Sequence, residues 1–90
     1  MAGINKQINL YTMNVLIIRR NGLIDDSPIL VKNDHTAEVV FESLVQDLLG
    51  DDDFKYFGDE SITKANNLLE PLGITIYWFV DIEVNNYINK

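Results

Sequence analysis

Apolar side chains between positions 37 and 48 recur every three or four residues, which is the spacing of one face of an α-helix. The face consists of Ala37, Val40, Phe41, Leu44, Val45 and Leu48. Polar residues fill the other side, so a second layer of structure must cover the apolar stripe. Asp34 or Thr36 is the expected N-cap, and Gly50 stands where a left-handed C-terminal cap is expected.

A second, shorter helix is predicted after residue 58, with Asp59 or Ser61 as its N-cap. Its apolar residues are Ile62, Ala65, Leu68, Leu69 and Leu72. Pro71 removes a backbone donor and restricts the residue before it, so it marks the end of this helix. Gly73 then turns the chain into the next element.

Close alternation of residue types predicts a strand over positions 74–84. Its expected core face consists of Ile74, Ile76, Trp78, Val80, Ile82 and Val84. Tyr77 and Phe79 share the second face with Asp81 and Glu83. Positions 13–20 are rich in Val, Leu and Ile, which predicts a central strand buried on both faces and paired with the last one.

Asn21-Gly22 is a strong turn signal, because both residues tolerate a positive φ. A two-residue hairpin would place Asp25 and Asp26 opposite the apolar positions 18 and 17, where an unpaired charge is costly. We therefore favour a wider loop over positions 21–28, followed by a strand over positions 29–32.

These elements predict an α+β fold, a small two-layer sandwich in β-β-α-α-β order. Two helices pack on one face of a three-stranded, mostly antiparallel sheet. Ninety residues suit a single domain over positions 1–90, with 1–7 and 86–90 expected to fray. There is no cysteine, so no disulfide supports the fold.

Seven basic and fourteen acidic residues give the chain a formal net charge of −7. A field of this sign repels phosphate backbones and anionic lipids, so we expect no direct binding to nucleic acid or to a membrane. It favours cations and basic protein surfaces. Without a visible secretory signal or a long apolar run, the chain is expected to be cytoplasmic.

No arrangement of residues nominates a catalytic site, a metal site or a cofactor site. His35 is the only histidine, and the glycines are scattered singly rather than forming a phosphate-binding loop. An EF-hand starting at Asp53 would place Gly58 correctly, but Lys55 and Phe57 stand where oxygen ligands are required. We therefore expect that the protein is not an enzyme.

The segment Asp51-Asp52-Asp53-Phe54-Lys55-Tyr56-Phe57-Gly58-Asp59-Glu60 interleaves carboxylates with aromatic rings between the two predicted helices. The rings either help to close the core, which we favour, or serve as anchors for a partner. Arg19 and Arg20 are expected to form an ion pair with Asp25 or Asp26. The Tyr77 and Phe79 face is either exposed or covered by the residues of positions 8–11.

Charge and composition favour a small acidic, non-enzymatic interaction protein that binds a basic surface of a partner protein. In size and charge alone it matches small inhibitors, immunity proteins, antitoxins and phage anti-defence proteins. The alternative is a structural or assembly subunit that forms a homodimer through its aromatic strand face. The candidate partner-binding residues are Glu38, Glu42, Asp47, Asp51, Asp52, Asp53, Phe54, Tyr56, Phe57, Asp59, Glu60, Tyr77 and Phe79.

Overall fold

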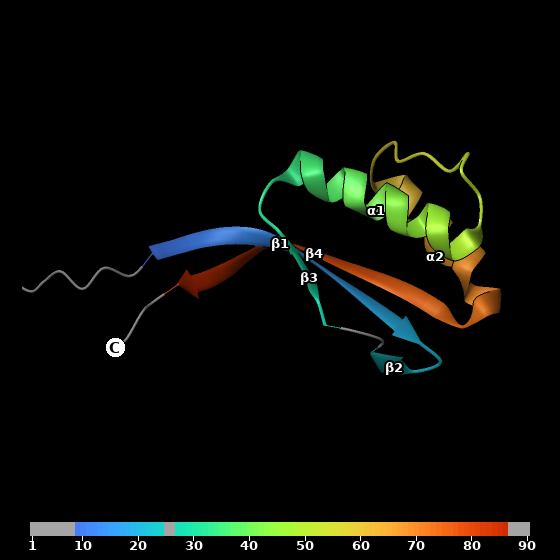
Figure 1. Cartoon of the computed structure of the whole chain (residues 1–90), viewed down its shortest axis with the longest axis horizontal. Helices are drawn as coiled ribbons and strands as arrows, with labels where there is room; N and C mark the ends of the chain where they lie inside the picture. The colour runs from blue at the N-terminus through green and yellow to red at the C-terminus, as the bar shows by residue number, and fades with distance from the viewer. Residues whose placement is uncertain (1–8, 25–26, 87–90) are drawn as a thin grey trace, which may run out of the picture.

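A computed structural model describes residues 9–24 and 27–86 and shows two helices lying on one side of an antiparallel sheet (Figure 1). The elements in chain order are β1 (Asn9–Arg20), β2 (Leu23–Ile24), β3 (Ile29–Val31), α1 (Asp34–Leu49), α2 (Asp59–Leu69), the 3-10 turn η2 (Glu70–Leu72) and β4 (Ile74–Asn86). The predicted α+β two-layer sandwich is confirmed. Of the ends expected to fray, residue 86 closes β4, and 1–7 and 87–90 lie outside the described residues.

Strand β1 is the centre of the sheet. It pairs with β4 along one edge, from Asn9 opposite Asn86 to Arg20 opposite Ile74. Both β2 and β3 pair with β1, and every pairing is antiparallel. Together β2 and β3 take the place of the second predicted strand, so the order becomes β-β-β-α-α-β.

The wider loop expected over positions 21–28 is wrong. Asn21 and Gly22 have φ angles of 50° and 86°, and they form a two-residue turn that places Arg20 opposite Leu23. Extending this register would pair Leu16 with residue 27, whereas Leu16 pairs with Ile29. The tight turn therefore forms, but β2 and β3 pair with β1 in different registers, so they are two separate strands. Asp25 and Asp26, and the ion pair expected from them, lie outside the described residues.

An extra residue in β4 interrupts its alternation. Met13 pairs with Ile82 and Val15 with Phe79, so Asn14 lies opposite two residues of β4, of which Asp81 has a φ of 52°. Such a bulge shifts every later residue to the other face of the sheet. Ile82 therefore shares a face with Phe79.

The core face predicted for the last strand is consequently right only in its first half. Ile74 and Ile76 are buried, and Trp78 packs against the core. Val80 and Ile82 are exposed, which corrects the prediction, and the side chain of residue 84 lies outside the description.

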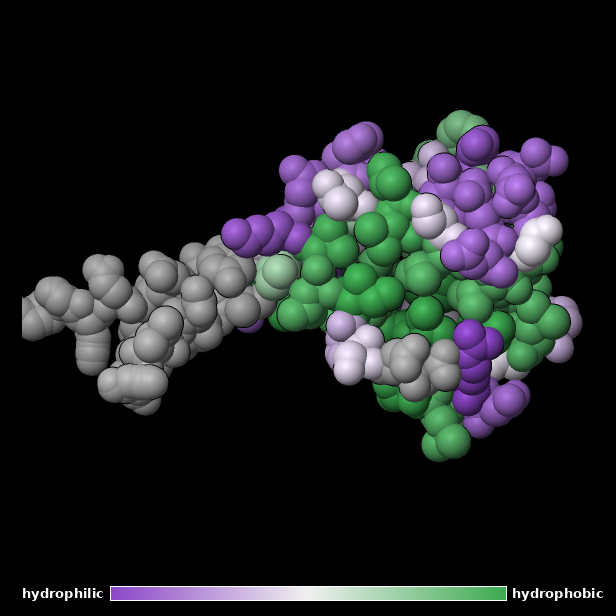
Figure 2. All heavy atoms as spheres, viewed as in Figure 1, coloured by the Kyte–Doolittle hydropathy of each residue, from purple (hydrophilic) through white to green (hydrophobic). Residues whose placement is uncertain are grey.

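The hydrophobic core lies between the helices and one face of the sheet. The residues buried in it are Leu16, Val31, Ala37, Phe41, Val45, Phe54, Ala65, Leu69, Ile74 and Ile76. Phe41 of α1 stacks on Trp78 of β4, with ring centroids 5.3 Å apart. The predicted stripe of α1 is confirmed. Leu68 is exposed because α2 buries only Ser61, Ala65 and Leu69, and Leu72 of η2 is also exposed. Figure 2 shows polar side chains concentrated over the helix layer.

The helix ends differ in part from the prediction. Asn33, rather than Asp34 or Thr36, is the N-cap of α1, and its side-chain oxygen accepts hydrogen bonds from the backbone of His35 and Thr36. Gly50 adopts the expected left-handed conformation with a φ of 66°. The N-cap of α2 is Gly58, rather than Asp59 or Ser61, and it has no side chain with which to cap the helix. The Ser61 hydroxyl accepts a hydrogen bond from the backbone N–H of Phe57.

Asn66 joins α2 to the edge of the sheet. Its amide nitrogen donates to the carbonyl of Ile76 over 3.0 Å, and its amide oxygen accepts from the Ile76 backbone N–H over 2.8 Å. The side chain thus pairs with β4 much as a neighbouring strand would. A buried backbone group without such a partner is costly, so this contact helps to hold the helix layer on the sheet.

We expect Asn66→Ala to lower the free energy of unfolding by about 1–3 kcal/mol, because it leaves both backbone groups of Ile76 unpaired. Chemical denaturation of the two variants Asn66→Ala and Asn67→Ala measures the effect. Asn67 is the exposed neighbour on the same helix, and its loss should change the stability by less than about 0.5 kcal/mol. Equal losses at both positions would contradict the assigned role of Asn66.

Candidate functional site

A cavity of about 330 Å³ lies where the first turns of α1 and α2 face the sheet. The residues that line it are Asn14, Asp34, Glu38, Tyr56, Asp59, Ile62, Trp78 and Val80. Its volume is far above the roughly 10–15 Å³ that one water molecule requires. It can therefore accept a side chain or a small organic group.

Three carboxylates line this cavity, and no Lys or Arg does so among the described residues. Asp34 and Asp59 stand in the first turns of α1 and α2, and Glu38 follows Asp34 one turn later. Carboxylates in the first turn of a helix are stabilised by about 0.3–1 kcal/mol each, because the helix dipole is positive there. The two helix starts thus stabilise carboxylates that no Lys or Arg lining the cavity neutralises.

Asn14 organises the sheet side of the cavity. Only 2% of this residue is exposed, and its amide nitrogen donates to Asp34 Oδ1 over 2.9 Å. Its amide oxygen accepts a hydrogen bond from Trp78 Nε1 over 2.8 Å. One buried amide therefore orients both a carboxylate and the indole ring. Such a buried network holds its members in a single arrangement when every member is satisfied.

Aromatic rings form the wall of the cavity. The ring centroids of Tyr56 and Trp78 lie 5.5 Å apart, and the backbone N–H of Tyr56 donates to Glu42 Oε1 over 2.9 Å. Burial, followed by the nearby charges of Glu38 and Asp59, raises the pKa of the Tyr56 phenol above its ordinary value of 10.0. The hydroxyl group is therefore protonated and uncharged near neutral pH.

The structure brings together three of the predicted partner-binding residues, Glu38, Tyr56 and Asp59. Sequence reasoning missed the contributions of Asn14, Asp34 and Trp78. It assigned Asp34 to helix capping and Trp78 to the core, and it did not consider Asn14. A polar residue inside the apolar run of positions 13–18 was the one available signal, because a buried amide needs partners.

The other acidic residues predicted to bind a partner are spread over the two helices and their connector. Asp51, Asp52 and Asp53 follow the C-terminal end of α1, about 24 Å from its start at 1.5 Å per residue. There, Asp51 Oδ1 accepts a hydrogen bond from the Asp53 backbone over 2.9 Å, which closes a local turn. Asp47 and Glu60 are exposed, and neither lines the large cavity.

The aromatic rings of the connector between α1 and α2 have different environments. Phe54 is buried against the core, as favoured for this segment, and its ring meets Phe41 edge-on. The same expectation is wrong for Phe57, of which 86% is exposed. Phe57 lies just before α2, and its backbone N–H donates a hydrogen bond to the Ser61 hydroxyl over 2.7 Å.

Glu42 lines a smaller adjoining cavity of about 140 Å³ together with His35, Glu38, Val39 and Tyr56. His35 Nδ1 lies 3.9 Å from Glu38 Oε1, and 84% of the histidine side chain is exposed. His35 is thus a surface residue at the start of α1.

Tyr77 and Phe79 lie on the opposite face of the sheet from the cavity. Their rings stack with centroids 6.3 Å apart, and Arg19 Nη1 donates to the Tyr77 hydroxyl over 3.1 Å. Residues 9–11 do not fold over them, because these residues continue β1 alongside β4; residue 8 lies outside the description. The predicted site residues therefore divide between two sides of the molecule.

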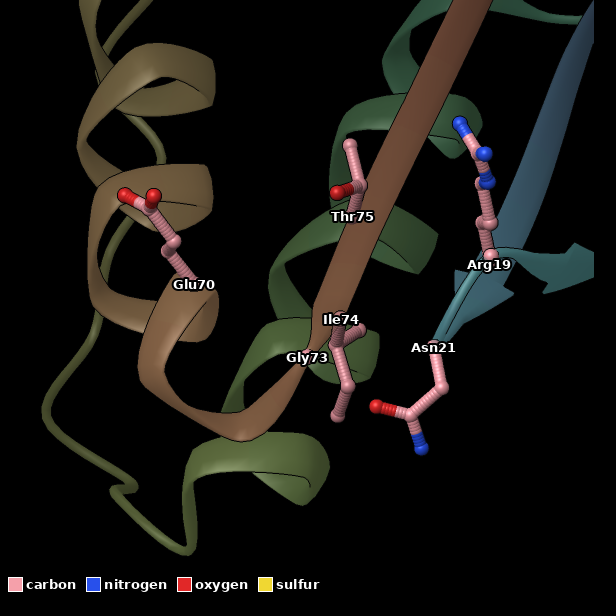
Figure 3. A pocket seen from close by; sticks show the side chains of 7 residues that line it. Arg19, Asn21, Glu70, Gly73, Ile74 and Thr75 are labelled. Carbon is pink, nitrogen blue, oxygen red and sulfur yellow. The ribbon is translucent and has the colours of Figure 1, made fainter.

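A further hollow of about 270 Å³ lies at the turn end of the sheet (Figure 3). Arg19 and Glu70 both line it, so its one cationic residue is offset by a carboxylate. Figure 3 shows these two side chains on opposite sides of the start of β4. This balance of charge makes the hollow a poor site for an anion.

No protein-family model matches the chain, and comparison with curated proteins and with solved structures finds no significant similarity. Within residues 9–24 and 27–86, no three side chains of His, Asp or Glu are grouped closely enough to hold a metal ion. In the same residues, no helix has the length and apolar character needed to cross a bilayer.

Tyr56 is expected to make the stability of the protein fall at alkaline pH. Since its pKa is raised in the folded state, the folded protein keeps this proton after the unfolded chain has lost it. The contribution to stability is complete below about pH 10 and is lost as the pH rises through the folded-state pKa. Tyr56→Phe should flatten this loss in urea unfolding series. If the free energy of unfolding of Tyr56→Phe falls with alkaline pH as steeply as that of the unsubstituted protein, another group is responsible.

Proposed function

We propose that this chain is a small, non-enzymatic interaction protein that binds a basic surface of a partner protein, and that the cavity receives an Arg or Lys side chain. The observation that carries the proposal is the cavity lined by Asp34, Glu38 and Asp59, with Tyr56 and Trp78 as its aromatic wall.

The chemistry of the wall suits an organic cation. Carboxylates form charge-assisted hydrogen bonds with guanidinium and ammonium groups, which are about twice as strong as neutral ones. The faces of Trp78 and Tyr56 can add a cation–π attraction of about 0.5–2 kcal/mol. Because Tyr56 is uncharged near neutral pH, its hydroxyl can donate or accept without adding a further charge.

A basic protein surface matches the surroundings of the cavity as well as its interior. Glu42, Asp47 and Glu60 belong to the same helix layer, and the whole chain carries a net charge of −7. A field of this kind speeds the encounter with a positively charged partner and discourages phosphate-bearing ligands. The proposal therefore excludes direct binding to nucleic acid or membranes.

We assign no catalytic role to these groups. The single histidine does not line the large cavity, and the chain has no cysteine nucleophile. In size and charge alone the protein is comparable to small inhibitors, immunity proteins, antitoxins and phage anti-defence proteins, which act by occupying a partner. The proposal also places it in the cytoplasm, because a fold without disulfides suits a reducing compartment.

Binding of an oligoarginine peptide tests the proposal directly. Trp78 is the only tryptophan and lines the cavity, so its fluorescence should change as the peptide binds. The affinity should fall steeply as salt is raised. The double variant Glu38→Gln with Asp59→Asn should weaken binding by about 10-fold or more, since each substitution removes a charge-assisted contact.

Asp47→Asn combined with Asp53→Asn is the matched control. It removes the same two charges from exposed positions outside the cavity, so it should weaken binding only slightly. Equal weakening by both double variants would mean that net charge alone attracts the peptide. An affinity that does not change with salt would count against the proposal altogether.

A further inference from the structure

The helices cover only one face of the sheet, and the face turned away from them is apolar. Cross-strand pairs place Val15 with Phe79 and Ile17 with Tyr77 on this bare face, and β3 adds Leu30 opposite Val15. Leu30, Phe79 and Ile82 are exposed, and Val15, Ile17 and Tyr77 are only half-buried. The expectation that the first strand is buried on both faces is therefore wrong within the single chain.

The register also keeps carboxylates off the centre of this bare face. The residues that it assigns there are Met13, Val15, Ile17, Arg19, Leu30, Thr75, Tyr77, Phe79 and Ile82. Asp81 stands in the bulge and is taken out of the alternation. The bare face thus has an apolar centre and a polar group at its end. Protein interfaces usually have the same composition, with an apolar core and a polar rim.

We propose that a second copy of this chain covers the bare face, so that two sheets pack face to face between two outer helix layers. This arrangement gives both copies of Phe79 and Leu30 an apolar neighbour. It is independent of the cavity, which lies on the other side of each sheet and stays accessible. The proposal therefore goes beyond the binding of a basic partner and stands without it.

The distribution of charged residues favours a second copy of the chain over a basic partner as the occupant of the bare face. Two chains of net charge −7 repel each other, but the described acidic residues of α1, α2 and their connector lie in the helix layer. Layers in a sandwich are about 10 Å apart, so three spacings separate the two helix layers by roughly 30 Å. The Debye length at physiological salt is about 8 Å, and the repulsion is largely screened. A basic partner would gain no carboxylate on the bare face and is drawn to the helix layer instead.

The size of the bare face sets the strength of the contact. Seven residues of β1, from Met13 to Arg19, span about 23 Å, and three strands span about 14 Å across. The area of this rectangle, roughly 320 Å², is smaller than the roughly 800 Å² that each partner buries in a standard interface. We therefore expect a dimer that dissociates on dilution.

Sedimentation equilibrium of the full chain over a range of concentrations measures this association. The expected result is a reversible dimer of the 10.3 kDa chain, with a dissociation constant that Phe79→Asp raises by about 30-fold or more. Leu68→Asp is the matched control, because Leu68 of α2 is 45% exposed and Phe79 is 46% exposed. It should leave the dimer intact. If Phe79→Asp fails to fold by circular dichroism, Leu30→Asp tests the same face.

A crosslinking experiment gives an independent readout. The chain has no cysteine, so Phe79→Cys and Leu68→Cys each introduce a single thiol. Mild oxidation should crosslink the Phe79→Cys protein as a dimer and leave the Leu68→Cys protein mainly monomeric. The proposal is overturned by a chain that is monomeric at its highest soluble concentration, whatever else covers the face. A dimer that survives both Phe79→Asp and Leu30→Asp also overturns it.

Discussion

The pairing of β1 with β4 is the interaction on which the rest of the structure depends, and its single bulge decides what each face of the sheet presents. Up to Phe79, alternation sends Ile74, Ile76 and Trp78 towards the helices. Opposite Asn14 the strand gains one residue, and Ile82 comes to lie on the same face as Phe79. Without the bulge, a carboxylate at position 81 would stand on the bare face, where it would oppose any apolar contact.

The same part of the sheet connects the two proposed surfaces. Asn14 lies opposite the bulge and is buried beneath the start of α1, where it binds both Asp34 and Trp78. On one side of this point the carboxylates and rings form a cavity suited to a cationic side chain. On the other side lies the stacked pair of Tyr77 and Phe79. Two kinds of contact, one polar and one apolar, can thus coexist without competing for the same surface.

Local patterns predicted the elements whose geometry depends on near neighbours in the chain. The stripe of α1 and the left-handed cap at Gly50 follow from helical spacing and from the conformational freedom of glycine. The tight hairpin turn was not predicted, because a second strand continuing in that register would place Asp25 opposite an apolar residue, whereas β2 ends at Ile24. The exposure of Phe57 was also missed, because local spacing does not show which rings of the connector face the core.

For the candidate site, acidic character was predictable, but the grouping of residues was not. Glu38, Tyr56 and Asp59 belong to separate segments, and only the packing of α2 beside α1 brings them around one cavity. Asn14 and Trp78 join them from two strands that are distant in the chain.

By itself, the sequence determined the α+β class, the two amphipathic helices, the central position of the first strand and the excess of negative charge. These depend on periodicity and composition, which are local or additive properties. The tertiary structure alone decided where the bulge falls, which carboxylates share a cavity and which face of the sheet is left bare. Those features depend on contacts between residues far apart in the chain, and one residue of register is enough to move a side chain from one face to the other.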